Sequence, residues 1–169
     1  SIETLNTGKS VNIGEGAGAS DDLSDNENVF VGYRSGTWNY TGYSNTAMGA
    51  YSLYSNTNGH SNMANGYKAL YYNNGSYNTA NGREALYANS NGEYNTATGY
   101  EALYSNFNGS KNTAYGSRAL WANGSGEDNT AFGFEALNAN TVGHSNTASG
   151  IQALYSNSSG ILNTAQGFH

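Results

Sequence analysis

Apolar and polar positions along the chain repeat with a period of 17 residues, longer than the period of a single helix or strand. The stretch "NTATGYEALYSNFNGSK", residues 95–111, is followed directly by "NTAYGSRALWANGSGED", which has nearly the same skeleton. Asn-Thr-Ala-x-Gly opens each unit, and a Gly/Asn turn closes it. The glycine of this motif recurs in ten registers, at Gly14, Gly32, Gly49, Gly66, Gly82, Gly99, Gly116, Gly133, Gly150 and Gly167.

Each unit predicts two short strands separated by turns, at residues 94–99 and 101–106 in this example. A 17-residue unit is too short for two packed helices, and its frequent glycines oppose helix formation. We therefore predict an all-β protein, a parallel β-solenoid of about ten coils. Coils that stack about 4.8 Å apart would form a rod of roughly 48 Å. Residues 1–27 form the first coil with the acidic insertion "SDDLSDNEN", and residues 28–169 continue the repeats in the same domain.

Strand alternation predicts which columns of the repeat face inward. The motif alanine and asparagine point inward, whereas the threonine and the variable fourth position point outward. A second asparagine column, which includes Asn106, leads into the turn and predicts a stacked amide ladder along the axis. A leucine column fills the core, at Leu53, Leu70, Leu86, Leu103, Leu120, Leu137 and Leu154.

An aromatic column follows the leucines directly, at Tyr54, Tyr71, Tyr87, Tyr104, Trp121 and Tyr155, with Asn138 interrupting it. Tyrosine is enriched at protein interfaces, so we interpret this column as an oligomer interface or as a platform for sugar rings. The burial of one leucine and one alanine per coil is smaller than the entropy lost in ordering 17 residues. This shortfall predicts a homo-oligomer, a trimer or a filament, joined along the aromatic column.

Composition narrows the function further. The 169 residues include no cysteine, which excludes disulfides and thiolate metal sites. The net charge of −6 and the absence of a basic stripe argue against a nucleic-acid partner. No apolar run is long enough to insert into a membrane, and no signal peptide is visible.

Three stretches carry a resemblance to a known family: "SVNIGEGAGAS", "NVFVGYRSG" and the serial "NTAxGxxALYxNxxG". They resemble the repeats of trimeric autotransporter adhesin heads, the YadA-like left-handed β-roll, and those of phage tail-fibre proteins. The resemblance covers residues 10–167. It implies a parallel homotrimer that acts as a stalk or binding head, outside the cell, on a cell surface or on the fibre of a virion or injection device.

Other candidate sites have less specific patterns. Asp21, Asp22, Asp25 and Glu27 offer oxygen ligands for Ca²⁺, but their spacing matches no known calcium loop, and a solvated loop is the simpler interpretation. His60, His144 and His169 are too scattered for a zinc site. No other cofactor is expected.

Two further columns permit a function as well as a structural role. The outward threonines have the regularity of an ice-binding solenoid, although ladder stabilisation explains them as well. Glu84 and Glu101 lie in adjacent coils, about 5 Å apart, which is the carboxylate spacing of retaining glycosidases. Lys68 and Arg118 share their column, so we interpret it as a mixed-charge ladder and predict no enzyme activity.

The expected function is therefore that of an extracellular structural and adhesive rod. Its partners would be other copies of itself and a surface glycan or other polymer, contacted through the variable positions. The alternatives are a self-polymerising filament subunit, a carbohydrate-binding module and an ice-binding solenoid.

Overall fold

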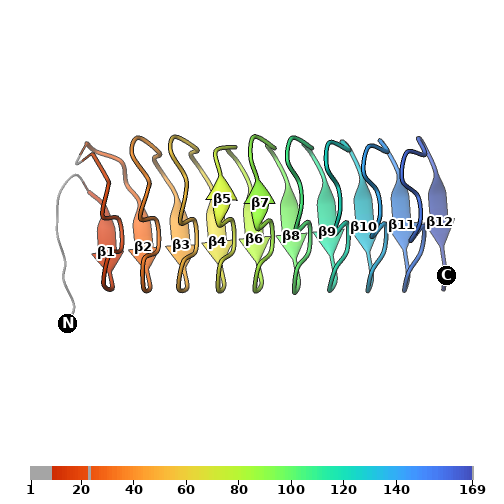
Figure 1. Ribbon diagram of the computed structural model, residues 1–169, viewed down its shortest axis with the longest axis horizontal. Coiled ribbons are helices and arrows are strands. Elements are labelled where there is room, and N and C mark those ends of the chain that lie inside the picture. Colours follow the sequence, from red (N-terminus) through yellow and green to blue (C-terminus); the bar gives the residue numbers. More distant parts are fainter. Residues whose placement is uncertain (1–8, 23, 169) are drawn as a thin grey trace.

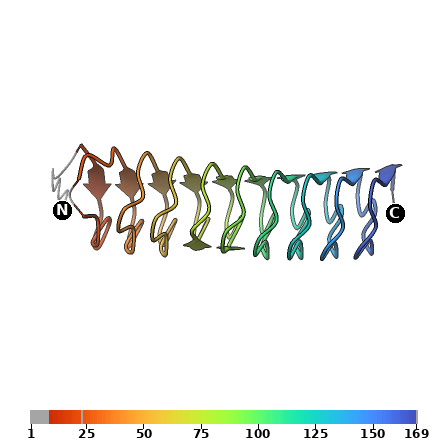
Figure 2. The same cartoon turned by 90° about the horizontal axis from the view of Figure 1, so that it is seen from above.

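The computed structural model describes residues 9–22 and 24–168, and in these residues the chain is a β-solenoid rod (Figure 1). Ten three-residue strands pair in parallel in one sheet, in the order β1-β2-β3-β4-β6-β8-β9-β10-β11-β12. Figure 2 shows this sheet edge-on along one side of the rod. The strands are β1 (Val11–Ile13), β2 (Val29–Val31), β3 (Thr46–Met48), β4 (Met63–Asn65), β6 (Thr79–Asn81), β8 (Thr96–Thr98), β9 (Thr113–Tyr115), β10 (Thr130–Phe132), β11 (Thr147–Ser149) and β12 (Thr164–Gln166).

The strands pair in a single register, so each residue lies beside its own equivalent in the neighbouring coils. Thr96 pairs with Thr113 and Ala97 with Ala114, and the same relation holds from β1 to β12. The predicted all-β parallel solenoid with a 17-residue repeat is thus confirmed. Every column of the sequence becomes a straight row along the rod.

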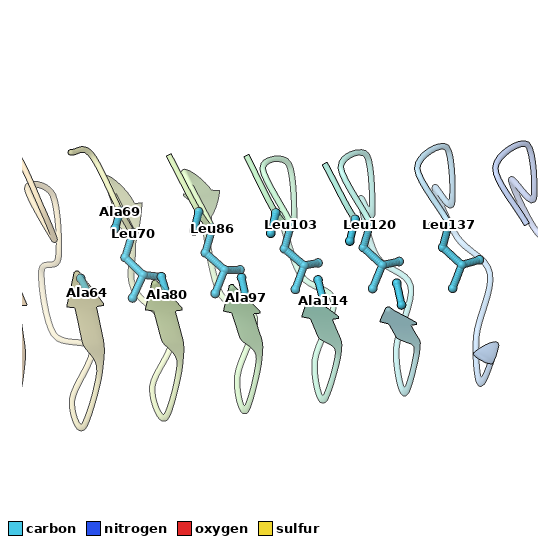
Figure 3. Close-up of a cluster of buried hydrophobic side chains, with 14 of the residues drawn as sticks. Ala64, Ala69, Leu70, Ala80, Leu86, Ala97, Leu103, Ala114, Leu120 and Leu137 are labelled. Carbon is cyan, nitrogen blue, oxygen red and sulfur yellow. The ribbon is translucent and has the colours of Figure 1, made fainter. Parts of the chain in front are cut away.

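The core is one leucine wide, as the period predicts. Leucines from the turn side point at the alanines of the sheet (Figure 3). Leu53, Leu70, Leu86, Leu103, Leu120 and Leu137 are 0% exposed. Leu154, also expected in the core, is only partly buried because it lies in the last leucine-bearing coil. A second alanine column, which includes Ala102, is also buried and thickens this thin core.

In the first two coils the large side chain comes from the sheet and the small residue from the turn, the reverse of the later coils. Phe30 takes the place of the small motif alanine, and Gly36 takes the place of the leucine. A Cβ at Gly36 would lie 2.5 Å from the Phe30 ring. Asn12 and Gly18 show the same exchange, with a Cβ at Gly18 only 2.6 Å from the Asn12 side chain. In both coils the glycine therefore leaves room for the larger side chain opposite it.

The second predicted strand of each unit is wrong for most coils. Among the described residues, only β5 (Tyr72–Asn73) and β7 (Ala88–Asn89) form strands there. In every leucine-bearing coil the segment contains a turn in which the leucine and the residue two positions before it have positive φ, 50° for Leu103 and 53° for Glu101. The segment must curve around a core one leucine wide, and left-handed residues provide that curvature at a cost of about 1–2 kcal/mol each.

Hydrogen bonds between coils continue through this turn despite its conformation. The Leu103 N–H donates to the Ala119 carbonyl at 2.9 Å, and the Glu101 N–H donates to the Arg83 carbonyl at 3.0 Å. One bond reaches the following coil and the other the preceding coil. The turn therefore pairs with both neighbours, as a strand would, and this pairing offsets the conformational strain.

Two asparagine ladders run through the interior, and the predicted amide ladder is one of them. In this ladder each Nδ2 donates to the Oδ1 of the preceding coil, at 2.7 Å from Asn106 to Asn89 and 2.8 Å from Asn123 to Asn106. The same Nδ2 of Asn106 also donates to the carbonyl of Gly109 in its own turn, at 2.7 Å. In the other ladder, the backbone N–H of the motif Asn112 donates to Asn95 Oδ1 at 3.0 Å.

The single 16-residue step in the repeat is absorbed without breaking the ladder. Asn73 still donates to Asn56 Oδ1 at 2.9 Å and receives a bond from Asn89 Nδ2 at 2.7 Å. Its second bond goes to Gly75, two residues on, whereas the other coils use the glycine three residues on. The missing residue therefore shortens only the outer turn.

The motif glycine is required by the close approach of successive coils. At Gly99 the backbone has a φ of 133°, and a Cβ would lie 2.6 Å from the carbonyl oxygen of Gly116. A side chain there would have both an unfavourable conformation and a clash with rigid backbone. The close approach of the coils thus explains why this glycine is the most regular feature of the sequence.

Candidate binding face

Three neighbouring rows on the turn side of the rod carry about half of its aromatic side chains together with several charged ones, and we call them together the aromatic face. The stripe is the aromatic column that follows the leucines. The charged row lies three residues before the stripe, and the outer row lies directly after the motif glycine. The stripe contains Tyr54, Tyr71, Tyr87, Tyr104, Trp121, Asn138 and Tyr155; the charged row contains Arg34, Tyr51, Lys68, Glu84, Glu101, Arg118, Glu135 and Gln152; the outer row contains Tyr33, Ala50, Tyr67, Arg83, Tyr100, Ser117, Phe134 and Ile151.

The stripe is a continuous stack of rings in five successive coils. Centroids are 4.9 Å apart for Tyr54 and Tyr71, 5.2 Å for Tyr71 and Tyr87, and 4.9 Å for Tyr87 and Tyr104, with the rings within 12° of parallel. Trp121 continues the stack at 5.7 Å from Tyr104. These side chains are half-buried, so stacking within one chain already covers much of the area that was predicted to need an oligomer.

Asn138 ends this stack, because the structure records no ring contact between Trp121 and Tyr155 in the described residues. The Asn138 amide donates instead to the Arg118 carbonyl at 3.1 Å. Burial raises the pKa of Tyr87 and Tyr104. The ring faces of the stripe are turned toward one another, so they are poorly placed to receive a sugar ring from solvent.

The outer row has a pattern of its own, with an aromatic ring on every second coil. Tyr33, Tyr67, Tyr100 and Phe134 are 39%, 41%, 40% and 46% exposed. Ala50, Arg83 and Ser117 lie between them, and Ile151 follows Phe134 in the next coil. The Arg83 guanidinium carbon lies 5.7 Å from the ring centroids of both Tyr67 and Tyr100. This row is the most accessible aromatic surface of the aromatic face.

The charged row joins the stripe to the outer row. The Lys68 ammonium lies 5.2 Å from the Tyr67 ring, in the outer row, and 5.6 Å from the Tyr71 ring, in the stripe. Arg118 Nε donates to Glu101 at 2.9 Å, and its Nη1 lies 3.9 Å from Glu135. The Glu101 and Glu135 side chains are only 13% and 14% exposed, because the rows on both sides cover them.

The environment of Glu101 favours the ionised carboxylate. Burial alone would raise its pKa, but hydrogen bonds from Tyr100 and Arg118 and the charge of Arg118 outweigh burial and lower the pKa below 4.5. A general acid needs the opposite shift. The ion pair with Arg118 makes Glu101 a rung of the mixed-charge ladder that the sequence indicates.

The four acidic residues proposed for calcium separate into two groups. Asp25 and Glu27 lie 3.1 Å and 3.9 Å from the Lys9 ammonium. Asp22 Oδ1 accepts a hydrogen bond from Asn26 Nδ2 at 2.9 Å, and the same Nδ2 also donates to Asp21 Oδ1. Hydrogen bonds from Ser24 lower the pKa of Asp22. Within the described part of the chain, no three acidic, histidine or cysteine side chains gather as a metal site would require.

His60 and His144 have separate surroundings. His60 stacks on Tyr43 with ring centroids 4.5 Å apart and meets Tyr77 edge-on at 4.9 Å. His144 Nδ1 accepts a hydrogen bond from the Glu127 N–H at 3.1 Å, and His169 lies outside the described residues.

The threonine row lies outward on the sheet, as predicted, and Met63 interrupts it. The variable row beside it includes Tyr115 and Phe132, which stack with centroids 5.0 Å apart. These rings are 52% and 57% exposed, so they stand out from the sheet. The surface is therefore uneven at the place where an ice-binding function would need a flat one.

The outer row was missed by reasoning from sequence alone. Its signal is the residue after each motif glycine, where Tyr33, Tyr67, Tyr100 and Phe134 alternate with other side chains. That alternation is visible only when pairs of repeats are compared. A comparison of single repeats makes the position look merely variable.

Beyond this face, a shallow hollow lies at the last coil, between residues 152–157 and 165–167.

Residues 9–22 and 24–168 contain no helix that is long and apolar enough to cross a membrane. No family model matches the chain, and comparison with curated proteins and with solved structures gave no match.

Proposed function

We propose that the protein is a structural rod for attachment, which presents the aromatic face to a polymer on another surface. The observation that carries the proposal is the single register of the ten strands. It places equivalent side chains in straight rows along one axis, so every contact made by one coil can be repeated by the next. A repeated surface of this kind suits a repeated ligand.

The composition of the aromatic face supports attachment over catalysis. Its carboxylates are paired with cations, as for Glu101 and Arg118, and such pairs hold side chains in place. Its exposed rings offer apolar surface with hydrogen-bonding groups beside it, which is the usual make-up of a recognition surface. The resemblance to adhesin heads and tail fibres agrees with this role and with a place outside the cell.

Co-sedimentation tests the proposal. Purified protein is mixed with intact bacterial and animal cells and with insoluble polysaccharides, and the bound fraction is measured after washing. The folded rod should bind at least one of these materials, and the Leu103→Asp variant, expected to be unfolded, should not. A folded rod that remains in the supernatant with every cell type and every polymer would refute the attachment function.

A further inference from the structure

We infer that the outer row binds a neutral, linear glycan that lies along the rod, with one sugar ring against an aromatic ring on every second coil. This inference rests on the proposed function, because it names the chemical class of the polymer. The residues that carry it are Tyr67, Tyr100 and Phe134, with Tyr33 at the start of the row.

The rings of the outer row are spaced two coils apart. Tyr67 and Tyr100 are separated by one coil that bears Arg83, and Tyr100 and Phe134 by one that bears Ser117. Two coils span about 10 Å. Two pyranose units of an extended 1→4-linked chain cover a similar length. Such a chain would therefore present an equivalent sugar ring to each aromatic ring in turn, without bending.

The rings of the outer row are open to solvent. Tyr67 and Tyr100 are 41% and 40% exposed, whereas the stripe beside them is half-buried in its own stack. Aromatic side chains contribute a large apolar area at a low entropy cost, and they dominate the energy of many binding surfaces. A ligand would thus meet the outer row before the stripe.

Positive and negative side chains lie together beside these rings. From Tyr67 to Phe134 and its neighbour Glu135, Lys68, Arg83 and Arg118 contribute three positive charges and Glu84, Glu101 and Glu135 three negative ones, so the sum there is zero. Arg34, beside Tyr33, adds one positive charge at the start of the row. The whole chain has a net charge of −6. A polyanionic glycan would therefore gain little attraction here and would be repelled at longer range. Hydroxyl groups of a neutral glycan can instead bond to the carboxylates and guanidinium groups.

Calorimetric titration with cello- and chito-oligosaccharides of two to six units tests the inference. Because only every second sugar meets a ring, a third sugar reaches a second ring and a fifth sugar reaches a third ring. Affinity should therefore rise about tenfold from two to three units and again from four to five. It should change little from three to four units and from five to six. A hexamer of galacturonate, which has similar length but carries negative charge, should bind more weakly than either neutral hexamer.

Variants in two rows provide the matched comparison. The double variant Tyr67→Ala with Tyr100→Ala should lose at least about tenfold in affinity for the neutral hexamer. The control is Tyr77→Ala with Tyr94→Ala, which removes a stacked pair of similar exposure outside the aromatic face. It should leave the affinity unchanged, and circular dichroism should show both variants folded.

The inference is overturned if neither neutral series binds, if the galacturonate hexamer binds more tightly, or if the two double variants weaken binding equally. In each of these cases, wild-type protein that still co-sediments with cells or polymers leaves the attachment function standing. If the wild type binds no cell, polymer or oligosaccharide, the proposed function fails together with the inference.

Discussion

Replacing Asn106 with alanine tests whether the internal amide ladder holds the coils together. The Asn106 side chain is fully buried. Its Nδ2 donates to Asn89 Oδ1 and to the Gly109 carbonyl, both at 2.7 Å, and its Oδ1 accepts from Asn123 Nδ2 at 2.8 Å. Alanine removes all three hydrogen bonds at once and can replace none of them.

The expected loss follows from these contacts. Three buried hydrogen bonds contribute about 1 kcal/mol each, and Asn89 Oδ1 is left buried without a donor, which adds about 1–2 kcal/mol. Asn123 Nδ2 keeps its bond to Gly126, at 2.8 Å, so it adds little. The free energy of unfolding should therefore fall by roughly 4 kcal/mol, a large fraction of the stability of an ordinary domain.

Urea unfolding followed by near-ultraviolet circular dichroism of the stacked tyrosines measures this loss. The matched control is Asn91→Ala, which removes a rung of the same chemistry on the surface, where Asn91 Nδ2 donates to Asn108 Oδ1 at 3.1 Å. The control should change the free energy of unfolding by no more than about 0.5 kcal/mol. Equal shifts for the two variants would show that the buried ladder does not stabilise the rod.

Three other predictions concern the core, the charged row and the stripe. Leu103→Asp should cost about 5 kcal/mol and abolish the circular dichroism of the folded state, because it places a charge in a core one leucine wide; a normal melting curve would contradict the face assignment. Because the pKa of Glu101 is lower in the folded than in the unfolded chain, its ionised carboxylate stabilises the fold above pH 4.5. This contribution is lost as the pH falls through the pKa of the folded state. Glu101→Gln should therefore flatten the fall in melting temperature below pH 4.5, and an unchanged pH profile would contradict the pairing with Arg118. If the stripe is also an oligomer interface, sedimentation should show Tyr87→Ser with Tyr104→Ser as a monomer and the wild type as a trimer or filament; a monomeric wild type would refute self-association.

The period, the sheet register and the inward columns were predictable because each follows from repeated local chemistry. Alternation places Ala97 and Asn95 inward without knowledge of the rest of the fold. The turn around Leu103 was not predictable in this way. Its "EALY" pattern reads as a strand, and the thin core overrides that preference by requiring positive φ at Glu101 and Leu103.

The candidate face was predicted in part for a similar reason. The stripe is visible as a column, but its rings were expected to stay exposed on a single chain. Columns that recur every 17 residues stack at the spacing of the coils, and that spacing is close to the distance at which aromatic rings pack, 4.9 Å for Tyr87 and Tyr104. Stacking therefore covers ring faces that a view of one repeat leaves open.

We assign the proposed binding function to the row of the rod that folding leaves unexplained. The leucine, alanine, asparagine and glycine rows are uniform, and burial, hydrogen bonding or close approach accounts for each. The outer row has no such constraint: Ala50, Arg83 and Ser117 occupy it as readily as Tyr67 and Tyr100 do. Its aromatic rings nevertheless recur on alternate coils from Tyr33 to Phe134, which no requirement of the core imposes. A surface pattern with twice the structural period is what we expect for the proposed partner, a polymer whose own repeat spans two coils.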